Sequence, residues 1–326
     1  MSGRLEGLTA VVNGAGRGIG RAIALEFAAE GARLVVNDLG TESWGTKSEP
    51  ERAEAVVEEI RASGGEAVAD GGDIADLDQA RGMIERALSV WGKLDILVNC
   101  AGIIRYGSVT DTPPEDFDAQ ISVHLRGYYN TTTAAAQHWV ERGEYGRLIN
   151  FTSDAADGLP SLLAYSTAKA GVVGFTRSCA NALVSYNVTS NCVRPLAATG
   201  MVDMVPVYQN SGQRPSETEI GKALDPRNVA PLIVFLASPA ASHVTGRTFT
   251  GTGSRYTLLT DQTVERIVES NFLADPDEVY AEFERTLCSG LRLEDLPTPM
   301  APLSELGDWK AMYGTAHPLW DFRQST

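Results

Sequence analysis

Residues 9–20 read Thr-Ala-Val-Val-Asn-Gly-Ala-Gly-Arg-Gly-Ile-Gly. The first five residues form an apolar run with β-branched side chains, which predicts a buried strand. The amphipathic run from Arg21 to Phe27, directly after the glycines, predicts a helix. The glycines at 14, 18 and 20 permit a tight turn, a close approach of the backbone to a ligand, and contact between helix and sheet. The chain is therefore expected to open as a strand, a glycine-rich turn and a helix.

Strand and helix patterns continue to alternate from Leu8 to about Phe249, which indicates a parallel sheet with helices on both faces. The expected strands are Thr9 to Asn13, Arg33 to Asn37, Ala67 to Ala69, Leu94 to Asn99, Arg147 to Phe151, Thr189 to Val193 and Thr248 to Thr250. The expected helices include Gly18 to Glu30, Pro50 to Ala62, Leu77 to Trp91, Pro114 to Val140, Leu162 to Val184 and Pro226 to Leu236. About seven strands predict an α/β fold with a doubly wound, Rossmann-type sheet.

The pattern divides the chain into a domain over residues 1–253 and an extension over residues 254–326. Residues 199–224 mix Met, Pro, Tyr, Gly and polar side chains, and we assign them to a mobile flap over the substrate. The extension ends in aromatic residues, namely Trp309, Tyr313, Trp320 and Phe322. Apolar surface on a terminal tail is usually buried against a neighbour. We therefore expect the extension to clasp another subunit of a homotetramer or homodimer, with a substrate lid as the alternative.

Composition excludes several classes of function. A net charge of −15 over 326 residues disfavours nucleic acid and anionic membrane surfaces as partners. We expect a cytoplasmic protein, because the chain has neither a signal-peptide pattern nor an apolar stretch long enough to span a membrane. The four cysteines form no CxxC pair and the four histidines are dispersed, so no metal site is expected.

The glycine-rich turn predicts a dinucleotide site. The start of the helix offers unpaired N–H groups and the positive end of the helix dipole to a pyrophosphate. Asp38 follows the second strand, 18 residues past Gly20, where a carboxylate can bind both ribose hydroxyls and repel a 2′-phosphate. Arg17 is a contrary signal, because its guanidinium could hold that phosphate. On balance the residues favour NAD, and a plain turn aspartate is the other interpretation of Asp38.

Tyr165 and Lys169 carry the candidate chemistry. They lie four residues apart in Tyr-Ser-Thr-Ala-Lys, so a helix places them on one face, where the ammonium can stabilise a phenolate. A tyrosine needs such help to act as a base, because its ordinary pKa is about 10. Such a pair usually only decorates a helix surface. Ser153, 12 residues earlier at the end of an apolar run, adds a hydroxyl that can hold a substrate oxygen, and Thr152 is the alternative.

These motifs together resemble the short-chain dehydrogenase/reductase family. The turn at 13–20 is similar to the family's TGxxxGxG, with Asn13 in the threonine position. The resemblance implies catalysis by Ser153, Tyr165 and Lys169. The family's fourth catalytic residue, an asparagine, is replaced by His124 in Val-His-Leu-Arg-Gly, and two interpretations remain: a core histidine, or a residue whose carbonyl holds a water beside the lysine.

The resemblance also implies the cofactor contacts. Asp73-Ile74 is similar to the adenine contact, Asn99-Cys100-Ala101-Gly102 to the NNAG motif, and Pro195 to Thr199 to the segment around the nicotinamide. The cofactor-binding residues that we expect are Asn13, Gly14, Gly16, Arg17, Gly18, Ile19, Gly20, Asp38, Leu39, Asp73, Ile74, Asn99, Ala101, Gly102, Tyr165, Lys169, Pro195 and Thr199.

The strings at 36–40 and 123–127 resemble (3R)-hydroxyacyl-CoA dehydrogenases of multifunctional enzymes and related bacterial hydroxysteroid dehydrogenases. This resemblance implies NAD-dependent oxidation of a secondary alcohol. We expect a small hydrophobic substrate, cyclic, steroid-like or terpenoid, because the flap holds Met201, Met204, Val205, Val207 and Tyr208. A (3R)-3-hydroxyacyl-CoA is the alternative substrate, and a non-catalytic NAD-binding sensor or scaffold is the alternative of another class.

Overall fold

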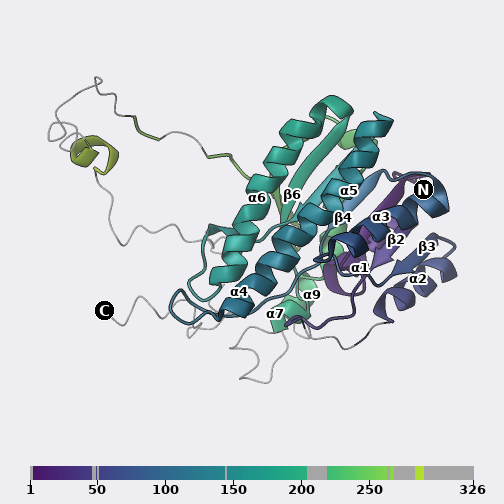
Figure 1. Ribbon diagram of the computed structural model, residues 1–326, viewed down its shortest axis with the longest axis horizontal. Coiled ribbons are helices and arrows are strands. Elements are labelled where there is room, and N and C mark those ends of the chain that lie inside the picture. The colour runs from purple at the N-terminus through teal and green to yellow at the C-terminus, as the bar shows by residue number, and fades with distance from the viewer. Residues whose placement is uncertain are drawn as a thin grey trace.

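The computed structural model describes residues 3–45, 49, 51–143, 145–203, 219–262, 265–267 and 283–289. The core of these residues is one twisted sheet between two layers of helices (Figure 1). Its strands are β1 (Thr9–Asn13), β2 (Arg33–Asn37), β3 (Glu66–Asp70), β4 (Ile96–Asn99), β5 (Gly146–Phe151), β6 (Val188–Leu196), β7 (Thr248–Thr252) and β8 (Arg255–Leu258). Their order is β3-β2-β1-β4-β5-β6-β7-β8. The predicted Rossmann-type α/β fold is thus confirmed.

The eighth strand differs from the prediction. β8 pairs antiparallel with β7, whereas all the other pairs are parallel. It falls in the segment assigned from the sequence to the extension, because its side chains are mostly exposed and form no apolar run. Gly253, with φ of 53°, allows the two-residue turn between the strands.

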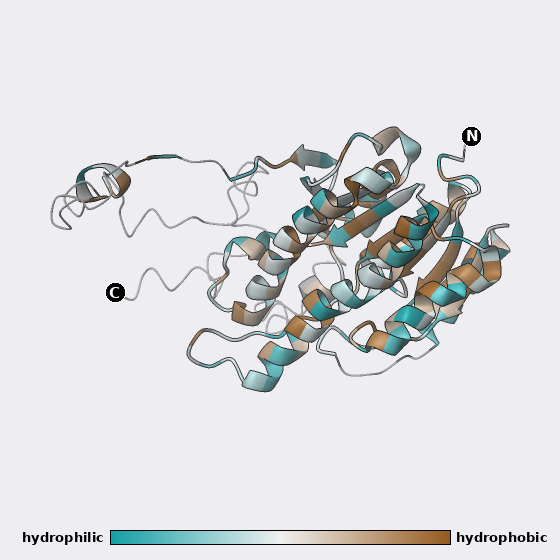
Figure 2. Cartoon of the chain, turned by 45° about the horizontal axis from the view of Figure 1, so that its top comes forward, coloured by the Kyte–Doolittle hydropathy of each residue, from teal (hydrophilic) through white to brown (hydrophobic). Residues whose placement is uncertain are grey.

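The helices form two layers because alternate strand residues point to opposite faces of the sheet. Ala10 and Val12 face one core, and Val11 faces the other. Figure 2 shows the apolar colour of the strands enclosed between helices whose outer sides are more polar. The main helices are α1 (Gly18–Ala29), α2 (Arg52–Ala62) and α10 (Ala230–Ala237) over the first core, and α3 (Leu77–Trp91), α5 (Gly127–Arg142) and α6 (Leu163–Leu183) over the second.

Two predicted helices are interrupted. The expected helix from Pro114 to Val140 consists of α4 (Pro114–Ile121), a π-helical turn η1 (Ser122–Arg126) and α5. Such π turns are frequent at functional sites, and this one carries His124. The helix expected from Pro226 begins as the 3-10 turn η5 (Pro226–Asn228), which Asp225 caps: its carboxylate accepts from the Arg227 N–H at 2.8 Å.

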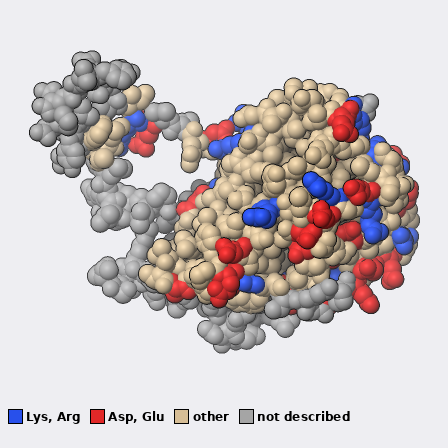
Figure 3. Space-filling model, in the orientation of Figure 1, with Lys and Arg blue, Asp and Glu red and all other residues tan. Residues whose placement is uncertain are grey.

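The net charge is spread over the surface that Figure 3 shows, where acidic and basic side chains lie interspersed. Within the described residues, no helix combines the length and the apolar character that a membrane span requires. The same residues contain no group of three or more His, Cys, Asp or Glu side chains that could hold a metal ion.

Candidate active site

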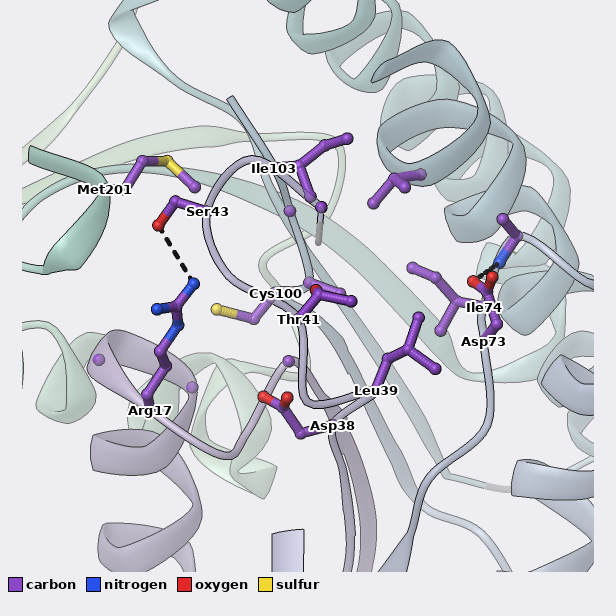
Figure 4. A pocket seen from close by; sticks show the side chains of 18 of the residues that line it. Arg17, Asp38, Leu39, Thr41, Ser43, Asp73, Ile74, Cys100, Ile103 and Met201 are labelled. Carbon is purple, nitrogen blue, oxygen red and sulfur yellow. Dashed lines mark hydrogen bonds between the residues drawn. The ribbon is translucent and has the colours of Figure 1, made fainter. Parts of the chain in front are cut away.

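A cleft of about 340 Å³ lies at the carboxyl edge of the sheet, around the point where β1 and β4 pair and the strand order changes direction. Figure 4 shows side chains from the segments after β2, β3, β4 and β6 pointing toward it. Its lining includes Gly14, Arg17, Gly18, Gly20, Asp38, Leu39, Asp73, Ile74, Cys100, Ala101, Gly102, Ile103, Thr199 and Met201. The fold therefore brings most of the predicted cofactor residues to one place.

The glycine loop forms as the spacing predicts. Gly14 and Gly18 have φ of 68° and 54°, a region that side-chain-bearing residues rarely adopt. Gly16 lies over Asp38, whose carboxylate accepts from the Gly16 N–H at 2.9 Å. The loop leads directly into α1, whose first residues are Gly18, Ile19 and Gly20.

Gly20 provides a stability prediction. A Cβ atom at Gly20 would lie 2.1 Å from the Gly14 carbonyl oxygen, a backbone atom that cannot move without distorting the loop. We expect Gly20→Ala to lower the free energy of unfolding by about 1–3 kcal/mol and to weaken cofactor binding. The control is Gly82→Ala in α3, where a Cβ meets nothing within 4 Å and we expect a small gain. Urea unfolding of both variants measures this, and equal stabilities would contradict it.

Asn13 and Asn99 are fully buried beneath the cleft. The Asn13 amide oxygen accepts from the backbone N–H groups of Cys100 and Ala101 at 3.0 and 2.9 Å, and its NH₂ group donates to Asn99 at 2.6 Å. Asn99 donates in turn to Asn150 at 2.9 Å. These side chains join the ends of β1, β4 and β5. They support the cleft from behind, without lining it.

The other predicted cofactor residues lie around the cleft. Asp38 is almost buried, and its second carboxylate oxygen accepts from the Gly40 N–H at 2.8 Å. The Asp73 carboxylate accepts from the Ala75 N–H at 2.9 Å, which turns the chain so that Ile74 lines the cleft. Pro195 lies near the end of β6, and Thr199 contacts the glycine loop closely enough that a Cβ at Gly18 would lie 3.2 Å from its methyl group.

Ser153 and Tyr165 lie next to Met201, a lining residue of the cleft, whose sulfur is 3.9 Å from the Tyr165 hydroxyl. The Ser153 hydroxyl faces the Tyr165 phenol and accepts from the Ala155 N–H at 3.2 Å. Burial raises the pKa of Tyr165 to about 12, and the hydrogen bond from Ser153 opposes that rise. The Thr152 hydroxyl, by contrast, is buried and donates to the Lys169 carbonyl at 2.7 Å. Of the two hydroxyls considered from the sequence, only that of Ser153 therefore faces Tyr165.

The Lys169 ammonium is buried between two aromatic rings. Its Nζ lies 5.4 Å from the ring centre of Tyr128 and 5.6 Å from that of Tyr165, and donates to the Phe151 carbonyl at 2.7 Å. Burial lowers the pKa of Lys169 to about 7. Because a phenolate nearby would favour the ammonium form, the charges on Tyr165 and Lys169 stabilise each other.

His124 is the remaining residue that was predicted to be catalytic. Its ring is fully buried, edge-on to Tyr165 at 5.1 Å, and Nε2 contacts the Ile103 carbonyl at 2.6 Å and N–H at 3.2 Å. Burial and the Lys169 charge hold the pKa of His124 well below its usual value. These contacts are those of a neutral core histidine. They also require a glycine at 102, because a Cβ there would lie 2.5 Å from the imidazole.

Two contributors to the site were missed from the sequence, and a third was given only a general role. Tyr128 supplies the second ring against Lys169, and nothing in its sequence context distinguished it from a core aromatic residue. The Met201 sulfur approaches the Tyr165 hydroxyl at 3.9 Å, although the sequence places Met201 only generally in the flap. Glu42 pairs with Arg17 at 3.0 Å. The flap residues Met204, Val205, Val207 and Tyr208 and the terminal aromatic residues lie outside the described residues.

Comparisons with known proteins agree with this geometry. A family profile described as Enoyl-(Acyl carrier protein) reductase matches residues 14–253. The chain is 38% identical over 292 residues to Hydroxyacyl-CoA dehydrogenase ChsB1 of Mycobacterium tuberculosis, which covers 85% of this chain and 87% of that protein. It is 36% identical over 247 residues to Peroxisomal hydratase-dehydrogenase-epimerase of Neurospora crassa, covering 76% of this chain but only 26% of that longer protein.

A solved structure extends the likeness to three dimensions. The short chain dehydrogenase from Mycobacterium paratuberculosis bound to NAD superposes with a TM-score of 0.68 at 29% identity, over 77% of this chain and 98% of that one. The fold and site thus define an oxidoreductase with a nicotinamide-type nucleotide cofactor. The chain belongs to the short-chain dehydrogenase/reductase family, whose members act on CH–OH groups and the corresponding ketones.

Proposed function

We propose that this protein is an NAD-dependent enzyme that interconverts a hydrophobic secondary alcohol and its ketone. The observation that carries the proposal is the convergence of Ser153, Tyr165 and Lys169 next to Met201, which lines the same cleft as the glycine loop. Met201 and Ile103 line the cleft with apolar side chains, which favours a hydrophobic substrate.

The residues present fit a dinucleotide. The glycine loop offers backbone N–H groups and the start of α1 to a pyrophosphate, and Asp38 lies where the adjacent ribose belongs. Leu39 and Ile74 line one side of the cleft and suit an adenine ring, whereas Met201 lies on the other side (Figure 4) and Thr199 lies against Gly18 of the glycine loop. The cofactor, when bound, accepts or gives a hydride at the nicotinamide ring.

The protein's own groups handle the proton. In oxidation, the Tyr165 phenolate takes the proton of the substrate hydroxyl, and in reduction the phenol returns it. The Ser153 hydroxyl holds the substrate oxygen within reach of Tyr165. The Lys169 ammonium lowers the cost of the phenolate, an effect strengthened by the burial of both groups. His124 packs edge-on against the Tyr165 ring. It stays neutral and exchanges no proton during the reaction, because burial lowers its pKa.

A panel of secondary alcohols tests the proposal. With NAD at alkaline pH, we expect sustained NADH formation with cyclic and long-chain apolar alcohols, and weak or no activity with short polar ones. NADH formation limited to one equivalent per subunit across the panel would instead indicate a binding protein without turnover.

A second candidate is the oxidation of a (3R)-3-hydroxyacyl-CoA. It is favoured by the 38% identity to a protein named as a hydroxyacyl-CoA dehydrogenase. The net charge of −15 disfavours a substrate with several phosphates. Including 3-hydroxyacyl-CoA thioesters of increasing chain length in the panel separates the two: a much higher kcat/KM for the thioesters would replace the first candidate by the second.

Asp38 provides the test of cofactor preference. We expect the wild-type protein to bind NADH more tightly than NADPH. Asp38→Ala should weaken the binding of NADH and narrow the difference in affinity between NADH and NADPH. The substitution removes a carboxylate that accepts from ribose hydroxyls and repels a 2′-phosphate. Dissociation constants from fluorescence titration measure both effects. A wild-type preference for NADPH would overturn the assignment of Asp38.

A further inference from the structure

Two arginines flank Gly16 of the glycine loop, whose N–H bonds to the Asp38 carboxylate where we place the cofactor ribose. Arg17 lines the cleft directly, and Figure 4 shows its guanidinium reaching toward Ser43. Arg52, at the start of α2, lies under the glycine loop, and one of its terminal nitrogens is 3.9 Å from the Asp38 carboxylate. Guanidinium groups are the usual ligands of phosphate, so both are potential contacts for a 2′-phosphate.

Both guanidinium groups are held by one carboxylate. One oxygen of Glu42 pairs with Arg17 at 3.0 Å, and the other pairs with Arg52 at 3.3 Å. Arg17 also donates to the Ser43 hydroxyl at 3.1 Å, and Arg52 pairs with Glu49 at 3.0 Å. Glu42 therefore bridges the two cations: it holds Arg17 toward Ser43 and pairs with Arg52 beside Asp38.

The backbone around Glu42 is anchored on both sides. Arg52 donates to the Thr41 carbonyl at 2.9 Å, and the Ser43 carbonyl accepts from the Ile104 N–H at 2.8 Å. The Trp44 carbonyl accepts from Arg105 at 3.0 Å. Because these bonds do not involve the Glu42 side chain, the segment keeps its path when that side chain changes. An exposed ion pair such as Arg17–Glu42 also contributes little to folding stability.

From this geometry we infer that Glu42 is a specificity-determining residue, which enforces the choice of NAD by keeping Arg17 and Arg52 from binding a 2′-phosphate. The inference rests on the proposed preference for NAD. It goes beyond Asp38, because Glu42 does not line the cleft and acts through the two guanidinium groups. It also explains how the protein can prefer NAD although Arg17 lies next to the glycine loop, a position that would otherwise favour the phosphorylated cofactor.

The test is Glu42→Gln, which keeps the size of the side chain and removes its charge. We expect the dissociation constant for NADPH to fall by at least about tenfold, because one repulsive charge is lost and Arg17 and Arg52 each lose one anionic partner. That for NADH should stay within about threefold, since NADH has the same pyrophosphate as NADPH but lacks the 2′-phosphate. NADPH binding to the variant should also weaken more steeply with added salt than in the wild type.

Glu59→Gln is the matched control, because it removes the same charge from an ion pair with Arg21 that lies outside the cleft. It should leave both dissociation constants unchanged. If Glu42→Gln leaves NADPH affinity unchanged while the wild type prefers NADH, the role of Glu42 is refuted and the proposed function stands. An equal gain for NADPH in both variants would show a general effect of net charge and also refute it. A wild-type protein that prefers NADPH would instead refute the proposed NAD preference itself.

Discussion

Replacing Tyr165 by phenylalanine is expected to reduce turnover at least about a hundredfold while cofactor affinity stays within a few-fold of the wild type. The substitution removes only the hydroxyl that faces Ser153 and leaves the ring that packs against His124 and Lys169. The chemistry therefore loses its proton acceptor without losing the site around it. Single-turnover kinetics and NADH titration separate the two quantities.

The matched control for this variant is Tyr186→Phe, in the 3-10 turn directly after α6, where the residue is exposed to solvent and contributes nothing to the cleft lining. It should leave turnover unchanged. A Tyr165→Phe enzyme with near wild-type turnover would mean that another group moves the proton, and the mechanism proposed for Ser153, Tyr165 and Lys169 would fall.

Replacing Lys169 by methionine should lower both turnover, again at least about a hundredfold, and cofactor affinity. Methionine occupies a similar volume between the Tyr128 and Tyr165 rings but brings no charge to stabilise the phenolate and no donor for a ribose hydroxyl. Unchanged affinity for NADH would restrict Lys169 to its electrostatic role.

Lys169→Met should also change how the free energy of unfolding depends on pH. The pKa of Lys169 is lowered from 10.5 to about 7 in the folded protein. Between these values the unfolded chain holds a proton that the folded protein has released, so the free energy of unfolding rises with pH, by at most about 1.4 kcal/mol per pH unit. Lys169→Met lacks this contribution. Urea unfolding at pH 7 and pH 9 should therefore show a smaller rise for the variant, and parallel profiles would contradict a lowered pKa.

The parts of the site that depend on local geometry were predictable from the sequence. The helical spacing of Tyr165 and Lys169 places both on one face of α6. The glycines at 14, 18 and 20 mark the tight turn that they form. The apolar strand runs were equally readable, because strands buried on both faces need continuous apolar side chains.

The parts that depend on long-range pairing were not predictable. Glu42 and Arg17 are 25 residues apart and meet only because the segment after β2 folds against the one after β4. The π-helical turn at His124 reflects tertiary packing, since its residues have the apolar spacing of an ordinary helix. β8 was missed because an exposed edge strand carries no apolar run to mark it.

The direction of β8 determines where the chain leaves the sheet. β7 ends at the carboxyl edge of the sheet, but β8 returns, so that the Leu259 N–H donates to the carbonyl of Thr248, the first residue of β7. Asp261 is then tied to Arg247 and to Arg177, which lies twelve residues, about 18 Å, along α6 from Tyr165. The point of exit is therefore at the end remote from the chemistry. The predicted extension therefore leaves the sheet away from the cleft that a substrate lid would have to cover.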